Sequence, residues 1–148
     1  MELSAAARES RSRLEVLWSR KGQDVGIEAP EGPVWVHGDP DALALVTTNL
    51  LANAVKYTAD KGRITVGVAP EPGGGRFFVS DTGIGIAPED QERILSGYFR
   101  TEEGKKAAKG FGVGLTLAQA LLSAHGSELK VESAVGKGSK FSFSLPAA

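Results

Sequence analysis

The sequence predicts an α/β two-layer sandwich, in which one mixed β-sheet carries helices on one of its faces. Two observations predict this class. Segments with helical and with strand periodicity alternate along the 148 residues, and turn residues separate them. The chain is also 41% hydrophobic, which is enough for one buried core at this length. The sequence therefore predicts a single domain of ordinary size, with no internal repeat.

The N-terminal segment predicts one helix and two short strands. Residues 2–20 carry apolar side chains at helical spacing, and Gly22 suits a C-terminal cap. Residues 25–29 and 34–37 have strand character, and the Pro and Gly residues between them indicate a turn. The predicted apolar face of the helix consists of Leu3, Ala7, Leu14, Leu17 and Trp18.

Asp39 and Pro40 mark the start of a longer predicted helix, which runs to about Thr58. Asp caps free backbone N–H groups, and Pro fits the first helical position. One apolar stripe repeats along this helix at steps of three and four residues, as a buried helix face requires. The stripe consists of Leu43, Val46, Leu50, Ala54 and Tyr57.

The rest of the chain predicts four strands and two further helices. Residues 64–68 alternate between apolar and polar, and residues 76–80 are expected to pair with them in antiparallel fashion through a turn at 70–75. The other expected elements are a short helix opened by Pro88, a loop at 98–112, a helix over 113–125 capped by Gly126, and final strands around 129–131 and 141–145.

Composition excludes several classes of protein. The net charge of −1 lacks the basic excess of a nucleic-acid binder. No apolar run reaches the roughly 18 residues of a membrane span, so we expect a cytoplasmic domain without direct membrane contact. The absence of cysteine excludes disulfides, thiol catalysis and Cys-ligated zinc. The 19 glycines are unusual, at about 13% against roughly 7% on average.

Asn49, Asn53 and Lys56 form the first group of candidate functional residues. Their spacing of four and three residues places them on one face of the predicted 39–58 helix. Asn is a mediocre helix former, so two in mid-helix suggest a use beyond local stability. An amide oxygen can ligate Mg²⁺, and a lysine supplies a point charge for phosphate. The alternative is a solvated helix face.

Asp81, Gly83 and Gly85 form the second group. A predicted strand ends at the carboxylate, and the two glycines permit a close backbone approach. An ionised Asp is acceptor-only, so it suits an exocyclic amine such as N6 of adenine. The alternative is an ordinary Asp–Gly turn.

Residues 110–115, GFGVGL, form the third group and lead directly into a helix. Free N–H groups at a helix N-terminus bind phosphate, and glycines let the phosphate come close. The spacing fits neither a Rossmann fingerprint nor a P-loop. The alternative is a flexible loop.

Together and in this order, the three groups resemble the histidine-kinase branch of the Bergerat-fold ATPases, a superfamily that includes gyrase, the Hsp90 chaperone and MutL. Residues 49–58, NLLANAVKYT, are similar to the N box of that family, and residues 81–86 and 110–115 to its two glycine boxes. Residues 98–100 fall at the F box, and residues 125–126 and 136–139 resemble the closing segment. The resemblance spans about residues 25–146 and implies the Bergerat ATP-binding fold.

The resemblance also implies roles for individual residues. Asn53 would ligate the Mg²⁺ ion that bridges the phosphates, and Lys56 would contact a phosphate. Tyr57 would pack on the adenine, and Asp81 would accept a hydrogen bond from its N6 amine. Residues 98–112 would form a lid over the ATP. Of its three lysines at 105, 106 and 109, Lys109 is the one expected to reach the γ-phosphate, and the alternative for each is solvated loop charge. The other implied nucleotide-binding residues are Gly83, Gly85, Ile86, Gly110, Phe111, Gly112, Val113, Gly114, Leu115 and Ser139.

Asn49 indicates which reaction to expect. In the hydrolytic relatives of this superfamily, a glutamate four residues before the metal-binding Asn activates water. An amide is no useful general base near neutral pH, so transfer to an external nucleophile is favoured over rapid hydrolysis. The predicted activity is that of a two-component sensor histidine kinase domain, with Asn49 and Lys56 as its catalytic residues. The alternatives are a serine kinase of the anti-sigma type and a nucleotide-binding pseudokinase module.

The two histidines, His37 and His125, lie outside any acidic-flanked helical phosphoacceptor motif, so a capping or core role is predicted for both. The acceptor histidine is expected on a separate dimerisation domain, and a response regulator is the expected second partner. Residues 1–22 would be an N-terminal helix, either the join to that domain or the first helix of this one. Residues 23–148 would form the ATP-binding domain, monomeric by itself, from a parent kinase that is either soluble or membrane-anchored.

Overall fold

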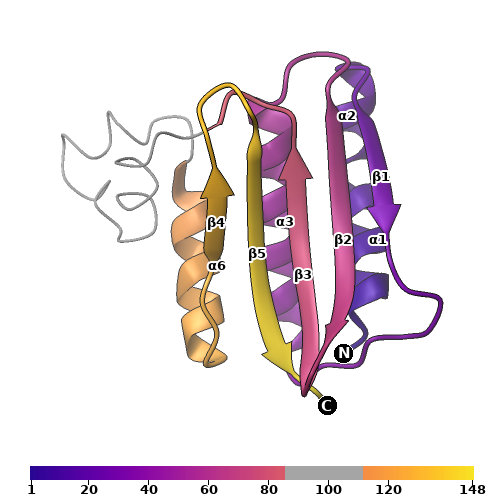
Figure 1. Cartoon of the computed structure of the whole chain (residues 1–148), viewed down its shortest axis with the longest axis vertical. Helices are drawn as coiled ribbons and strands as arrows, with labels where there is room; N and C mark the ends of the chain where they lie inside the picture. The colour runs from indigo at the N-terminus through magenta and orange to yellow at the C-terminus, as the bar shows by residue number, and fades with distance from the viewer. Residues whose placement is uncertain (86–111) are drawn as a thin grey trace.

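The computed structural model describes residues 1–85 and 112–148, without the side chains of residues 112–114. A five-stranded sheet in the order β1-β2-β3-β5-β4 forms one layer, and the helices cover one of its faces (Figure 1). This arrangement confirms the predicted α/β two-layer sandwich. The short helix expected at Pro88 and most of the expected loop at 98–112 lie outside the described residues.

The sheet is mixed because one of its edge strands runs parallel to its neighbour. β1 (Asp24–Glu28) pairs in parallel with β2 (Arg63–Glu71), and the other neighbours are antiparallel: β2 with β3 (Gly74–Asp81), β3 with β5 (Ser139–Pro146), and β5 with β4 (Lys130–Ser133). The β3–β5 register sets Asp81 directly opposite Ser139, so residues 58 apart in sequence meet at one end of the sheet.

The predicted N-terminal helix is two helices, α1 (Leu3–Arg13) and α2 (Glu15–Arg20), which join at Leu14. Leu17 N–H donates to the Leu14 carbonyl at 2.9 Å, which closes a tight turn of the 3₁₀ type. This turn changes the direction of the side chains after Leu14 relative to those of α1. Leu3, Ala7 and Leu14 are buried as predicted, but Leu17 is 49% exposed. The predicted single apolar face is therefore wrong at Leu17, whereas Trp18 packs against the core as predicted.

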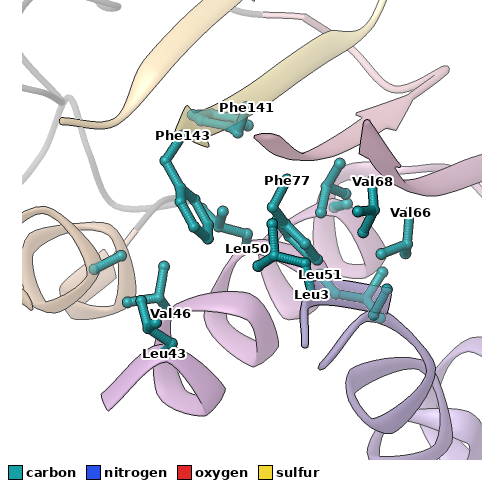
Figure 2. Close-up of a cluster of buried hydrophobic side chains, with 14 of the residues drawn as sticks. Leu3, Leu43, Val46, Leu50, Leu51, Val66, Val68, Phe77, Phe141 and Phe143 are labelled. Carbon is teal, nitrogen blue, oxygen red and sulfur yellow. The ribbon is translucent and has the colours of Figure 1, made fainter. Parts of the chain in front are cut away.

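α3 (Pro40–Tyr57) lies against the middle of the sheet, and its limits confirm the predicted start and end. The Asp39 carboxylate accepts a hydrogen bond from Asp41 N–H at 3.0 Å, which supplies the expected N-terminal cap. Figure 2 shows Phe77 and Phe143 of the sheet pointing toward the buried leucines of α3 and toward Leu3. The two phenylalanine rings stack with centroids 5.3 Å apart. The predicted stripe is buried from Leu43 to Ala54, and Tyr57 is half-buried.

Glu2 connects α1 to the segment before α3. Its carboxylate accepts hydrogen bonds from Ser4 N–H at 2.7 Å, Ala5 N–H at 3.2 Å and Val34 N–H at 3.1 Å. Burial by itself would raise the pKa of Glu2, but the hydrogen bonds from Ser4, Val34 and Ala5 together lower it below the ordinary value of 4.5. The ionised carboxylate therefore stabilises the N-terminal end of the fold.

Residues 34–37 do not form the predicted strand. Trp35 forms an isolated bridge with Glu2, and Val36 forms one with Ala147. The segment crosses between the two ends of the chain and bonds to each in turn, so no continuous ladder develops. Its side chains still alternate, with Val34 and Val36 buried and Trp35 and His37 exposed.

α6 (Gly112–Ala124) packs beside α3 and completes the helical layer. Its limits agree with the predicted helix over 113–125, and Gly126 follows it with a φ of +71°. In residues 1–85 and 112–148, none of the helices has the length and apolar character needed to cross a membrane.

Candidate functional site

The end of β3 and the start of β5 form what we name the Asp81 corner: Asp81, Gly83, Gly85, Gly138 and Ser139. The Oδ1 atom of Asp81 accepts hydrogen bonds from Gly83 N–H at 2.8 Å and from Ser139 N–H at 3.3 Å. Within the described residues, both hydrogen bonds of this carboxylate end on Oδ1. The carboxylate is thus held in a fixed orientation with Oδ2 left to accept from another donor.

Glycine is required in the corner for two different reasons. A Cβ at Gly83 would lie 2.5 Å from the carbonyl oxygen of Tyr57, so only glycine allows this close approach. Gly138 has a φ of +83°, and a Cβ there would collide with the carbonyl oxygen of Asp81. Gly136 N–H also donates to Ile84 O at 2.8 Å, which ties the turn after β3 to the turn before β5.

Burial raises the pKa of Asp81, because the charged form loses solvation in the corner. The hydrogen bonds from Gly83 and Ser139 oppose this shift without cancelling it. The carboxylate is therefore an under-solvated acceptor, and such a group gains from a hydrogen-bond donor that a ligand brings.

Asn49, Asn53 and Lys56 lie together on α3 and form what we name the amide face. Asn49 and Asn53 are half-buried, and Lys56 is exposed. Within the part of the chain that the structure describes, the side chains of Asn49 and Asn53 form no hydrogen bond. The Lys56 ammonium lies 5.6 Å from the centroid of the Tyr57 ring. The amide face therefore offers two amide groups and one positive charge to a ligand.

Tyr57 joins the amide face to the Asp81 corner. It is the last residue of α3 and follows Lys56 directly, while its carbonyl oxygen touches Gly83. The structure thus brings together two of the three groups that the sequence singled out. Polar groups that suit an anion and a divalent ion lie beside a carboxylate that suits an amine.

The chain matches the model of the family described as "Histidine kinase-, DNA gyrase B-, and HSP90-like ATPase" over residues 38–148. It belongs to this family. The match contains both the amide face and the Asp81 corner, and it confirms the predicted family and its ATP-binding fold.

Similar proteins with this ATPase domain are sensor kinases. The chain is 37% identical to the sensor histidine kinase RppB of Synechocystis sp., over 83% of this chain and 27% of the relative. It is 38% identical to the histidine protein kinase DivJ of Caulobacter vibrioides, over 79% of this chain and 20% of the relative. The chain thus spans about a quarter of the length of RppB, and it is an ATP-binding domain of the histidine-kinase type.

Solved structures agree with this assignment. Full-length ShkA in complex with AMPPNP superimposes with a TM-score of 0.85 at 27% identity, over all of this chain and 30% of that one. The catalytic domain of the histidine kinase ThkA, in a nucleotide-free form, gives 0.84 at 26% identity, over 99% of this chain and 96% of that one. The second likeness covers nearly the whole of both chains, so it extends to the sheet and all the described helices.

The third predicted group of this ATPase domain is described only in part. Gly112, Val113, Gly114 and Leu115 form the first turn of α6. The side chain of Leu115 is 2% exposed and lies in the core, so any contact with a nucleotide would come from its backbone. Ile86, Lys109, Gly110 and Phe111 lie outside the described residues, as do the F-box residues 98–100.

The two histidines differ in their surroundings. His125 Nε2 accepts from Asp39 N–H at 3.1 Å, and Nδ1 lies 2.7 Å from the Leu121 carbonyl, so the ring connects α6 to the start of α3. The predicted structural role of His125 is confirmed. For His37 the same prediction is wrong, because its side chain is exposed where residues 34–37 alternate between core and solvent.

Sequence reasoning missed two supporting residues of the corner. Ser133 Oγ donates to the Gly138 carbonyl at 2.9 Å, and it lies 2.9 Å from the hydroxyl of Ser139. The resemblance of residues 136–139 to the closing segment gives Gly138 no role of its own, although its positive φ brings Ser139 to Asp81. The strand pairing of β4 with β5 creates both contacts, and no local motif announces that pairing.

Proposed function

We propose that this domain binds Mg–ATP and transfers the γ-phosphoryl group to a histidine on the phosphoacceptor domain of a sensor kinase. One observation carries the proposal: the half-buried Asp81 carboxylate is anchored through one oxygen beside the amide face. A site with an amine acceptor at one end and phosphate-binding groups at the other matches the chemistry of an adenine nucleotide.

Asp81 would select the base. In this proposal its Oδ2 accepts a hydrogen bond from the exocyclic N6 amine of adenine, while Gly83 keeps the corner open for the ring. Guanine carries an acceptor oxygen at the corresponding position, which would face a carboxylate without a proton between them. Adenine nucleotides are therefore expected to bind in strong preference to guanine nucleotides.

Asn53 would hold the Mg²⁺ ion. The described residues contain no group of three or more His, Cys, Asp or Glu side chains that suits a metal. This fits Mg²⁺, which takes one or two protein ligands and obtains the rest from phosphate and water. When bound, the ion would neutralise phosphate charge, and the Lys56 ammonium would add a further positive charge.

Asn49 would keep the site from hydrolysing ATP. The transfer forms a bond between a histidine ring nitrogen and the γ-phosphorus, breaks the bond from that phosphorus to the β–γ bridging oxygen, and releases ADP. Phosphoryl transfer depends mainly on positioning and charge stabilisation. A side-chain amide cannot take a proton from water near neutral pH. With Asn49 in this position, water would therefore not be activated to compete with the histidine for the γ-phosphoryl group.

Residues 1–22 are proposed to be part of this domain. Leu3 and Ala7 are 0% exposed and share one core with α3 and the sheet, which supports this choice over a separate connecting helix. Deleting these residues would uncover that core. The phosphorylated histidine domain would in turn pass its phosphoryl group to a response regulator, which is the second proposed partner.

Nucleotide titration and a transfer assay test the proposal together. Calorimetry with ADP and ATP, with and without Mg²⁺, should show adenine-specific binding that Mg²⁺ strengthens. Radiolabelled ATP with an added phosphoacceptor domain should then give a phosphorylated product that is labile in acid and stable in base, as phosphohistidine is. An acid-stable product would favour a serine kinase, and binding without any transfer would favour a pseudokinase.

A further inference from the structure

Two side chains from the segment after α2 hold the carbonyl end of α3. The Lys21 ammonium donates to Val55 O at 2.7 Å and to Thr58 O at 2.8 Å. Gln23 Nε2 donates to the same two carbonyls, at 3.0 Å and 2.9 Å. We name Lys21 and Gln23 the α3 clamp.

The clamp meets a physical need of the helix. The last four carbonyl groups of an α-helix have no partner within it, and a positive charge at that end complements the helix dipole. Lys21 supplies both a donor and a charge. Gln23 is 5% exposed, so the hydrogen bonds of its side-chain amide are shielded from water. Two donors on each of two carbonyls fix the position of the helix end more firmly than one would.

The clamp is itself held on a rigid support. Lys61 N–H donates to Lys21 O at 2.9 Å, and Asp24 N–H donates to Gly62 O at 3.0 Å. Gln23 stands directly before Asp24, the first residue of β1, which pairs with β2. The position of the clamp is therefore set by the sheet and by the loop that leads into β2.

The held carbonyls lie on either side of Tyr57. Lys56, directly before it, belongs to the amide face, and the carbonyl oxygen of Tyr57 touches Gly83 of the Asp81 corner. A displacement of the helix end would move Tyr57 O against Gly83, whose N–H is bonded to Asp81. The contacts from the clamp to the carboxylate are continuous.

We propose that Lys21 and Gln23 are positioning residues for nucleotide binding, which they serve through Tyr57 and Gly83 without touching the ligand. The inference rests on the proposed binding of ATP at the Asp81 corner. Lys21 is also the C-terminal cap of α2, so the clamp ties the N-terminal helices to the nucleotide site.

The test compares Lys21→Met with Lys21→Arg and with Lys130→Met. Met keeps the length of the stem and removes the donor, and Arg restores a charged donor. Lys130 is an exposed residue of the edge strand β4, so its replacement controls for the loss of one positive charge. ADP affinity is measured by calorimetry well below the melting temperature of each variant, so that only folded protein is compared.

Lys21→Met should weaken ADP binding about three- to tenfold, the range expected for coupling through contacts between neighbouring residues. Lys21→Arg should recover most of that loss, and Lys130→Met should match the parent. Without nucleotide, the backbone amide resonances of Gly83 and Ser139 should shift in Lys21→Met and stay unchanged in Lys130→Met. A purely structural role would lower the melting temperature and change neither the affinity nor these resonances, and that result would overturn the inference.

The two proposals fail in different ways. If the parent protein does not bind ADP, the proposed function is wrong, and the resonances of Gly83 and Ser139 still decide whether the clamp positions the corner. If the parent binds ADP and Lys21→Met binds it equally well, only the positioning role is wrong.

Discussion

The Asp81 corner and the amide face are built in different ways, although both are proposed to hold the same nucleotide. Backbone N–H groups of Gly83 and Ser139 fix the corner, and a side chain at Gly138 would disrupt it. The amide face consists of side chains on a helix surface, and within the described residues Asn49 and Asn53 form no hydrogen bonds that a ligand would have to break. The comparison teaches that the proposed base site is formed in advance, whereas the proposed phosphate site would be completed by its ligand.

Replacing the corner carboxylate should have the largest effect. Asp81→Asn removes a charged acceptor, and hydrogen bonds to charged groups contribute about 1.5–3 kcal/mol, so ADP and ATP should both bind roughly 10- to 150-fold more weakly. Calorimetry without Mg²⁺ measures this change, and Asp60→Asn, at an exposed position, is the control. An ADP affinity equal to that of the parent would remove the carboxylate from the proposed site.

Replacing Asn53, the proposed Mg²⁺ ligand, should affect binding at the phosphate end of the nucleotide only. Asn53→Ala should remove about tenfold or more of the affinity that Mg²⁺ adds to ATP binding, because the ion loses its protein ligand. Affinity without Mg²⁺ should stay close to that of the parent. Titrations across a series of Mg²⁺ concentrations separate the two, and a variant that still responds to Mg²⁺ like the parent would contradict this role.

A comparison of alanine variants at Gly136 and Gly138, in one turn, separates the effect of backbone strain from the effect of a displaced Asp81 corner. In Gly138→Ala the new side chain has to adopt a positive φ and also collides with Asp81 O. Gly136 has a φ of +79° too, but a Cβ added there meets no other atom, so Gly136→Ala introduces only the backbone strain. Both should lose about 1–2 kcal/mol of unfolding free energy from backbone strain, and Gly138→Ala should lose more. Chemical denaturation measures stability and ADP titration measures the site. Equal effects of the two variants on ADP binding would show that the corner tolerates displacement of Ser139.

Glu2 is a carboxylate for which we propose a role in the fold but none in nucleotide binding. Its replacement should therefore have the smallest effect of the series, and the effect should be on stability only. Its folded-state pKa is lowered, so its contribution is present above the unfolded pKa and is lost as the pH falls through the folded pKa. Glu2→Gln should cost about 0.5–2 kcal/mol near neutral pH and much less in acid, with nucleotide affinity unchanged. Urea denaturation across the acid range measures this.

Asp81 should show the opposite dependence on pH. Its folded-state pKa is raised, so its contribution to stability falls as the pH rises from the unfolded value toward the folded one. ADP affinity should nevertheless increase over the same range, because only the ionised carboxylate is a full acceptor. The control is Asp81→Asn, in which both trends should disappear; their persistence would assign them to another group.

The sequence predicts those parts of the molecule that local patterns determine. Asp39 and Pro40 set the start of α3, and the alternation along residues 64–68 predicts β2. Other features depend on contacts between distant segments. The turn that divides α1 from α2 follows from packing around Leu14, residues 34–37 bond to both ends of the chain, and Lys21 reaches a carbonyl 34 residues away. The motifs singled out Asp81, Gly83, Gly85 and Ser139 of the corner and the three residues of the amide face, but only the fold reveals Gly138, Ser133 and the other groups that support them.

The junction of β3 with β5 has a consequence for how the protein is made. Asp81 acquires its second backbone donor from Ser139, which lies 58 residues later in the chain and opens β5. A ribosome must therefore release β5 before the Asp81 carboxylate, the proposed base-binding group, is held by both of its hydrogen bonds. The growing polypeptide therefore carries the amide face long before it has the complete Asp81 corner.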